Sequence, residues 1–290
     1  MESETMNRTG MIFMVMLCGM CAGCMNQHPE EGKRIPVVVT IPPLAEFVER
    51  VGGSAVQVTV MVPPGADPHT YEPTPGQLEE VSHAMVYVKV GSGIEFELAW
   101  MDNLLDMNKF MLVVDCSQGI GLIPSGEPDS LSYDPHIWLS PRNAQIMVQT
   151  ICEALISLDP ENEGYYKENK EAYITELITL DEELKRIFSG SEGKKIMVIH
   201  PAWTYFCRDY GIQQIPIERE GKEPTPRGIA EVIEQAHLYG ITVIVASPEF
   251  NTESAEVIAR EIGGRVILVS PLEKSYTQML YRFAQACMEA

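Results

Sequence analysis

Residues 143–188 read NAQIMVQTICEALISLDPENEGYYKENKEAYITELITLDEELKRIF, and this stretch divides the chain into two halves of similar pattern. Its first part, Asn143–Leu158, carries apolar residues at helical spacing until Asp159-Pro160 interrupts it. A second helix is expected from about Glu161 to Phe188, because the segment is rich in Glu, Lys and Leu and ends before Gly190. A helix of roughly 28 residues is about 40 Å long. We therefore expect one long rigid backbone helix that joins two lobes.

Extended apolar segments alternate with helical ones on both sides of this stretch. The expected strands before it are Pro36–Thr40, Val56–Val62, Met85–Val90 and Met111–Asp115. Those after it are Lys195–His200, Ile215–Ile217, Ile241–Ala246 and Val266–Val269. Such alternation predicts an α/β fold in which each lobe is a mainly parallel sheet flanked by helices. The expected division is an N-terminal lobe at 35–142, connecting helices at 143–189 and a C-terminal lobe at 190–290.

The composition is that of a folded protein with a surplus of negative charge. The chain has 290 residues, 45% of them hydrophobic, which excludes a disordered chain and suffices for two lobes with their own cores. The formal net charge is −20. This charge repels phosphate backbones and attracts cations, so nucleic acid is not an expected partner. It fits a cation ligand, although it would also simply keep the protein soluble.

The first 34 residues resemble an export and tethering segment. An apolar run from Met11 to Gly23 is too short to span a bilayer but has the length of a signal-peptide core. Small residues precede Cys24 as in a lipoprotein box, so we expect a signal peptide at 1–23, lipid on Cys24 and a polar tether at 24–34. The protein would then be extracytoplasmic, anchored to the outer face of the cell membrane. Cys18, Cys21 and Cys24 also spell C-x-x-C-x-x-C, but a metal cluster is not expected inside an apolar export segment.

Three histidines stand out by their positions. His69 ends a proline-rich loop directly after a predicted strand, His200 closes another strand, and His136 shares the tripeptide Asp-Pro-His with His69. Each stands beside a proline, which stiffens the backbone, and we interpret all three as lying at strand ends, where open α/β sheets place ligand groups. Asp67 and Asp134, two residues before their histidines, are expected to orient the rings or lower the positive charge of the site. The pattern predicts a metal site.

The remaining histidines are interpreted as structural. His28 lies in the tether, His83 at a helix end and His237 on a helix surface. Cysteines after the tether stand at four positions without close spacing: Cys116, Cys152, Cys207 and Cys287. Cys152 and Cys207 have apolar helical neighbours and are expected to be buried thiols. Whether any pair forms a disulfide is left open.

Four motifs resemble a known family along residues 35 to 287: TIPP at 40–43, PGADPHTYE at 64–72, DPHIWLSP at 134–141 and HPAW at 200–203. They are similar to those of the cluster A-I metal-binding proteins of ABC importers. The resemblance implies two α/β lobes joined by a rigid helix, with the metal in the cleft between them. It also implies that His69 and His136 come from the first lobe and His200 from the second. A membrane-bound ABC permease is the implied partner of a monomeric, non-enzymatic carrier.

Zinc is the expected cargo, because imidazole favours zinc whereas carboxylates favour manganese, and manganese carriers of this family often have Glu where His200 stands. The family often supplies a fourth ligand, an Asp, from the loop after the last strand. Here that loop reads Val269-Ser270-Pro271-Leu272, so Ser270 occupies the place of the carboxylate. Water near Ser270 and the carboxylate of Glu249 are the two candidates for the fourth ligand. Glu249 could also only support a ligand or cap a helix.

Several alternatives to a zinc carrier stay open at this point. A manganese or iron carrier of the same family is the nearest, and a surface adhesin of the same fold is another. Three histidines with an open water position also resemble the centre of a zinc hydrolase. No general base stands at a recognisable spacing from them, so an enzyme is not expected.

Overall fold

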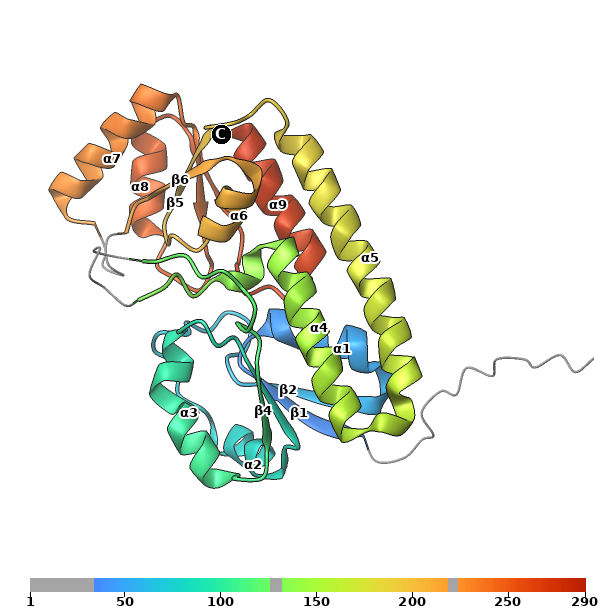
Figure 1. Cartoon of the computed structure of the whole chain (residues 1–290). Coiled ribbons are helices and arrows are strands. Elements are labelled where there is room, and N and C mark those ends of the chain that lie inside the picture. Colours follow the sequence, from blue (N-terminus) through green and yellow to red (C-terminus); the bar gives the residue numbers. More distant parts are fainter. Residues whose placement is uncertain (1–33, 126–131, 219–223) are drawn as a thin grey trace, which may run out of the picture.

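The computed structural model describes residues 34–125, 132–218 and 224–290, which form two lobes bridged by a pair of long helices (Figure 1). The predicted signal peptide at 1–23, the tether before Arg34, Cys24 and His28 lie outside the described residues.

Each lobe contains a four-stranded parallel sheet with the same order of strands. The first sheet, in the order β2-β1-β3-β4, contains β1 Ile35–Val39, β2 Val56–Val60, β3 Val86–Lys89 and β4 Leu112–Asp115. The second, in the order β6-β5-β7-β8, contains β5 Lys195–Val198, β6 Gln213–Pro216, β7 Val243–Ala246 and β8 Arg265–Leu268. The predicted fold class is confirmed, and every predicted strand end lies within two residues of the observed one. In both sheets the first strand is central, the second pairs on one side of it, and the third pairs on its other side. This order creates a topological switch point between β1 and β3 in the first sheet and between β5 and β7 in the second.

Helices cover both faces of each sheet. In the first lobe they are α1 Pro42–Gly52, α2 Pro75–His83 and α3 Glu95–Met107. In the second they are α6 Thr204–Tyr210, α7 Pro226–Tyr239, α8 Glu253–Glu261 and α9 Tyr276–Glu289. Short 3-10 turns lie at Gly53–Ala55, Ile137–Leu139 and Pro160–Asn162.

The two linking helices are α4 Pro141–Leu158 and α5 Glu163–Phe188, which pack against each other along the side of the molecule (Figure 1). The Ser140 side chain accepts a hydrogen bond from the Asn143 backbone N–H and caps α4, with Pro141 in the first turn. The α-helical part of the second helix begins two residues later than the sequence predicted, because Pro160–Asn162 form a 3-10 turn first. At 26 residues α5 is about 39 Å long, so it spans both lobes as expected.

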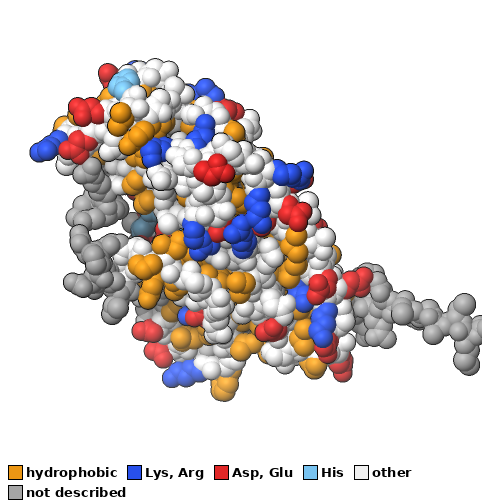
Figure 2. Space-filling model, turned by 45° about the horizontal axis from the view of Figure 1, so that its top comes forward, with side chains coloured by type: hydrophobic (Ala, Val, Ile, Leu, Met, Phe, Trp, Pro, Cys, Tyr) orange, Lys and Arg blue, Asp and Glu red, His pale blue; other side chains and the backbone are white. Residues whose placement is uncertain are grey.

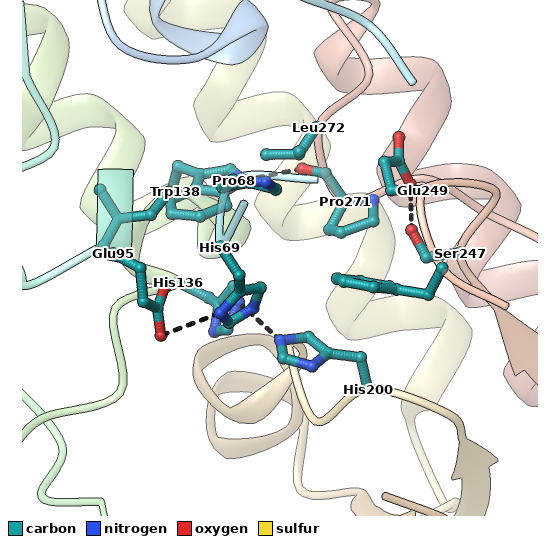
Figure 3. A pocket seen from close by; sticks show the side chains of 12 residues that line it. Pro68, His69, Glu95, His136, Trp138, His200, Ser247, Glu249, Pro271 and Leu272 are labelled. Atoms are coloured by element: carbon teal, nitrogen blue, oxygen red, sulfur yellow. Dashed lines mark hydrogen bonds and ion pairs between the residues drawn. The ribbon is translucent and has the colours of Figure 1, made fainter. Parts of the chain in front are cut away.

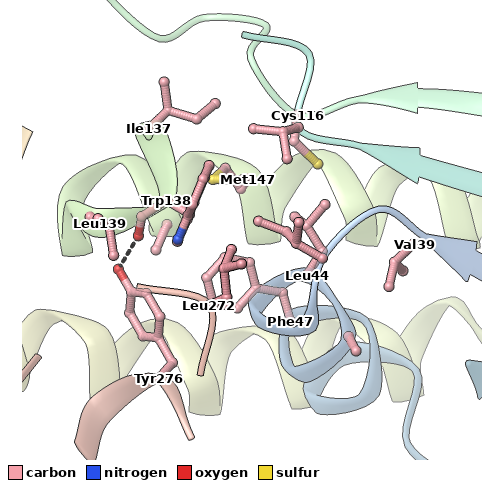
Figure 4. Close-up of a cluster of buried hydrophobic side chains, with 14 of the residues drawn as sticks. Val39, Leu44, Phe47, Cys116, Ile137, Trp138, Leu139, Met147, Leu272 and Tyr276 are labelled. Atoms are coloured by element: carbon pink, nitrogen blue, oxygen red, sulfur yellow. Dashed lines mark hydrogen bonds between the residues drawn. The ribbon is translucent and has the colours of Figure 1, made fainter. Parts of the chain in front are cut away.

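The two lobes share one apolar core where they meet. Leu44 of the first lobe, Trp138 of the 3-10 turn at 137–139 and Leu272 of the second lobe belong to the same buried cluster (Figure 4). Hydrogen bonds cross the same region: the Trp138 indole N–H donates to the Pro271 carbonyl at 2.8 Å, and the Tyr276 hydroxyl donates to the Trp138 carbonyl at 2.7 Å. A large hinge motion would expose this core and break these bonds, so we expect only small movements between the lobes.

The surface carries both signs of charge. On the face in Figure 2, acidic and basic side chains are interspersed with scattered apolar ones, rather than gathered into one basic stripe. Among the helices of the described residues, none is long and apolar enough to cross a membrane.

Candidate metal site

His69 lies on the loop between β2 and α2, and a local turn fixes its backbone. The Asp67 carboxylate accepts a hydrogen bond from the His69 backbone N–H at 2.9 Å, and Pro68 stands between them. The His69 ring pairs with a different carboxylate: its Nδ1 is 3.3 Å from Oε1 of Glu95. Glu95, and not Asp67, therefore orients this ring, whereas the negative charge of Asp67 still acts on it by raising the pKa of His69.

His136 repeats the same backbone turn in the second Asp-Pro-His tripeptide. Its backbone N–H donates to Oδ1 of Asp134 at 2.9 Å, and its ring Nδ1 lies 3.0 Å from the same oxygen. Asp134 thus orients the ring as predicted. The prediction that His136 lies at a strand end is wrong, because it comes directly before the 3-10 turn Ile137–Leu139, twenty-one residues after β4 ends at Asp115. An Asx turn, not a strand, holds it in place.

His200 follows β5 by two residues, at the carboxyl end of the second sheet. Its ring Nδ1 lies 3.1 Å from Oε2 of Glu218. The two residues face each other because β5 and β6 pair with Val198 opposite Pro216, and the same offset places His200 opposite Glu218. Both side chains are nearly buried, with 11% and 12% exposed.

Glu95, the partner of His69, is the first residue of α3 and is positioned by its neighbour Glu97. The buried Glu97 carboxylate accepts hydrogen bonds from the backbone N–H groups of Val90 and Gly91, at 2.6 and 2.9 Å, and from the Thr40 hydroxyl at 2.6 Å. These bonds fix the first turn of α3 to the carboxyl ends of β1 and β3, which is the switch point of the first sheet. Burial raises the pKa of Glu97, against the effect of these hydrogen bonds.

The three imidazoles converge from the two lobes (Figure 3). Nε2 of His136 and Nε2 of His200 are 3.3 Å apart, and the His69 and His200 ring centroids are 5.5 Å apart. Each ring has its Nδ1 engaged by a carboxylate, which leaves Nε2 as the free nitrogen. Two ligand nitrogens at 2.0–2.1 Å from a tetrahedral zinc are about 3.3 Å apart, so the spacing of His136 and His200 suits one ion between them. Carboxylate–histidine pairs of this kind hold the tautomer that metals require.

The three rings need a small adjustment before they can share one ion. As the side chains stand, the described part of the chain contains no group of three or more His, Cys, Asp or Glu residues with the geometry to hold a metal. His69 has the most freedom, because its side chain is 33% exposed whereas His136 is 15% and His200 11% exposed. The pocket encloses about 20 Å³ of free space, room for one ion or one water-sized group.

The pKa values of His69 and His200 shift in opposite directions. The hydrogen bond to Glu95 raises the pKa of His69, whereas burial lowers the pKa of His200 despite its hydrogen bond to Glu218. Burial opposes ionisation of Asp134, but hydrogen bonds from His136 and Thr204 and the charge of His136 together outweigh it and lower the pKa of the carboxyl. At neutral pH His200 is therefore more readily available than His69 as a neutral ligand.

Of the two positions considered for a fourth ligand, Glu249 lines the pocket from the C-terminal lobe, and Ser270 directly precedes Pro271, which also lines it. The Glu249 carboxylate accepts hydrogen bonds from the Ser247 and Ser270 hydroxyls. Glu249 forms no hydrogen bond or ion pair with the three histidines in the described structure. The geometry thus favours an exogenous fourth ligand over Glu249.

Sequence reasoning missed two residues of the site, Glu95 and Glu218. Both follow strands in the sequence, and Glu218 can be found once the register of β5 and β6 is known. Glu95 has a weaker signal, namely its place after β3 at the switch point. The other described histidines lie away from the rings: His83 ends α2 and His237 lies in the last turn of α7, as predicted. The four described cysteines are buried and free, which answers the question of disulfides among them.

Comparison with known proteins agrees with this arrangement. The family model described as "Zinc-uptake complex component A periplasmic" matches residues 37–290. The high-affinity zinc uptake system protein ZnuA of Bacillus subtilis is 27% identical over 90% of this chain and 88% of its own length. The manganese-binding lipoprotein MntA of Halalkalibacterium halodurans is 28% identical over 87% of this chain and 85% of its own. A crystal structure of ZnuA superposes with a TM-score of 0.84 at 40% identity, covering 89% of this chain and 99% of that one. The chain belongs to the family of periplasmic zinc-uptake complex components A.

Proposed function

We propose that this protein captures one zinc ion between its lobes through Nε2 of His69, His136 and His200 and delivers it to an ABC import permease. The observation that carries the proposal is that all three rings have Nδ1 engaged by a carboxylate and converge on one small pocket. Zinc is satisfied by four ligands, so three imidazoles and one water complete its shell. Manganese prefers oxygen ligands, which this set supplies poorly.

Membership of a transport family makes the chain a binding component of an uptake complex and not an enzyme. Its place outside the cytoplasm follows from the same family. The finer expectations belong to the proposal: lipid on Cys24 anchors the mature chain to the membrane, and the chain acts as a monomer.

Capture and release depend on ligands from both lobes. His69 and His136 belong to the first lobe and His200 to the second, so a bound ion favours the arrangement in which the lobes are closest. The metal shifts this equilibrium only by its differential affinity for the two arrangements. A permease that draws the lobes apart by a small amount would remove His200 from the ion and release it.

The test is metal content after competition. The purified protein is equilibrated with equal zinc, manganese and iron, dialysed and analysed for metals, beside His200→Ala and the control His237→Ala. We expect one zinc per chain in the parent and the control. Since zinc sites of four ligands are worth about 10–16 kcal/mol, the loss of one ligand weakens binding on the order of 100- to 1,000-fold in His200→Ala. Manganese or iron in place of zinc would contradict the proposal. So would equal retention of zinc by His200→Ala and His237→Ala during dialysis against a competing chelator.

A further inference from the structure

An aromatic side chain, Phe250, packs against two of the three imidazoles. Its ring centroid is 4.9 Å from that of His200, with an angle of 32° between the ring planes, and 6.0 Å from that of His69. Phe250 lines the same pocket as the rings, together with Pro271 and Leu272. It follows Glu249 directly, in the turn after β7, so the two side chains share one short segment.

The Glu249 carboxylate lines this pocket beside Phe250, on the side of the C-terminal lobe. Two serine hydroxyls donate hydrogen bonds to it. Ser247 donates to one of its oxygens and Ser270 to the other. The Leu272 backbone N–H donates to Ser270 Oγ at 3.1 Å, which fixes the direction of that hydroxyl. In Figure 3, Glu249 and Ser247 lie together at one side of the pocket, apart from the three imidazole rings. The carboxylate is thus satisfied without a metal.

We propose that Phe250 determines metal specificity by occupying the side of the site from which Glu249 would otherwise reach the ion. This inference rests on the proposed zinc site. With Phe250 in place, the ion receives three imidazoles, and the free space of about 20 Å³ has room for the ion but not for an added carboxylate. A nitrogen-rich set of four ligands suits zinc, whereas an added carboxylate and more water would suit manganese.

The proposal is tested with a set of substitutions at the two positions. Phe250→Ala and Phe250→Val shorten the side chain, Phe250→Leu retains most of its apolar volume, and Glu249→Gln removes the carboxylate charge. Zinc and manganese dissociation constants are measured for each by competition with a chromophoric chelator, and thermal melting identifies any variant that fails to fold. Phe250→Val replaces Phe250→Ala if the latter does not fold.

The expected result is a change in selectivity that depends on Glu249. Phe250→Ala lowers the ratio of zinc to manganese affinity at least 10-fold, Phe250→Leu and Glu249→Gln leave it within about 2-fold, and the double variant Phe250→Ala/Glu249→Gln restores it. An unchanged ratio in both Phe250→Ala and Phe250→Val, or a lowered ratio that persists in the double variant, would overturn the role of Phe250. If the parent itself binds no zinc, it is the proposed function that fails.

Discussion

Nε2 of His136 and Nε2 of His200 lie 3.3 Å apart, although the residues are 64 positions apart in the chain and come from different lobes. Their other ring nitrogens point to different carboxylates, Asp134 and Glu218. Two neutral imidazoles that meet through Nε2 can make only one hydrogen bond, and only if one of them carries its proton there. The carboxylates favour the proton on Nδ1 of both rings, so the two Nε2 lone pairs face each other and favour a cation between them.

Glu95 is predicted to set the pH dependence of zinc binding. Its hydrogen bond raises the pKa of His69 above the ordinary value of 6.5. Protons therefore begin to compete with zinc for this ring at a pH above 6.5, and the competition grows as the pH falls. Zinc affinity is therefore full at high pH and falls as the pH drops through the raised pKa. In Glu95→Gln the fall shifts to lower pH, whereas affinity at pH 8 decreases roughly 10- to 100-fold because the ring loses its orienting partner.

The check is a zinc titration at a series of pH values from 8 to 5 for the parent and Glu95→Gln. Glu79→Gln, on the exposed face of α2, is the matched control and should follow the parent. A parent affinity that stays flat from pH 8 to 5 would rule out a site built from histidines.

The bond between Tyr276 and Trp138 is predicted to contribute to stability rather than to metal binding. Tyr276→Phe removes the hydroxyl that donates to the buried Trp138 carbonyl at 2.7 Å and leaves that carbonyl without this donor. We expect the free energy of unfolding to fall by about 1–3 kcal/mol in urea denaturation. Tyr239→Phe, at a half-exposed helix position, should change it by less than about 0.5 kcal/mol. Equal free energies of unfolding for Tyr276→Phe and the parent would show that this hydrogen bond between the lobes contributes little to stability.

The four described cysteines are predicted to be unreactive in the folded protein. Burial raises the pKa of Cys207 to about 12 and raises the pKa values of Cys116, Cys152 and Cys287 as well. Thiolate is the reactive form, so alkylation by iodoacetamide at pH 8 should be slow at all four positions. Peptide mass mapping should find all four labelled after unfolding without reductant. Rapid labelling of any of them in the native protein would contradict the packing described here.

The sequence allowed much of the fold to be predicted, since periodicity and proline placement report on local structure. Each predicted strand end lies within two residues of the observed one, and Pro160 begins a helical segment as expected. Helix α4 begins at Pro141, two residues before the predicted start at Asn143. The start of α5 was predicted two residues too early, because the 3-10 turn at Pro160–Asn162 has the same composition as a first helical turn, whereas its end at Phe188 was predicted correctly.

Only the parts of the site that depend on residues close together in the sequence could be predicted. The Asp-Pro-His tripeptides identified His69 and His136, and the backbone turn that Asp134 forms is a local interaction. The partners of the other two rings are not local: Glu95 lies 26 residues after His69, and Glu218 lies opposite His200 only because β5 and β6 pair in that register. Which carboxylate meets which ring is decided by the sheets, and sequence spacing alone does not contain it.

The central claim is that one zinc ion is held by three imidazoles from two lobes, and X-ray absorption at the zinc edge of the zinc-loaded protein tests it most directly. The account predicts about three nitrogen ligands with imidazole scattering and one further oxygen, all at about 2.0–2.2 Å. In His200→Ala the imidazole contribution should fall to two. A shell with sulfur at about 2.3 Å, or one of oxygens with one imidazole or none, would contradict the account.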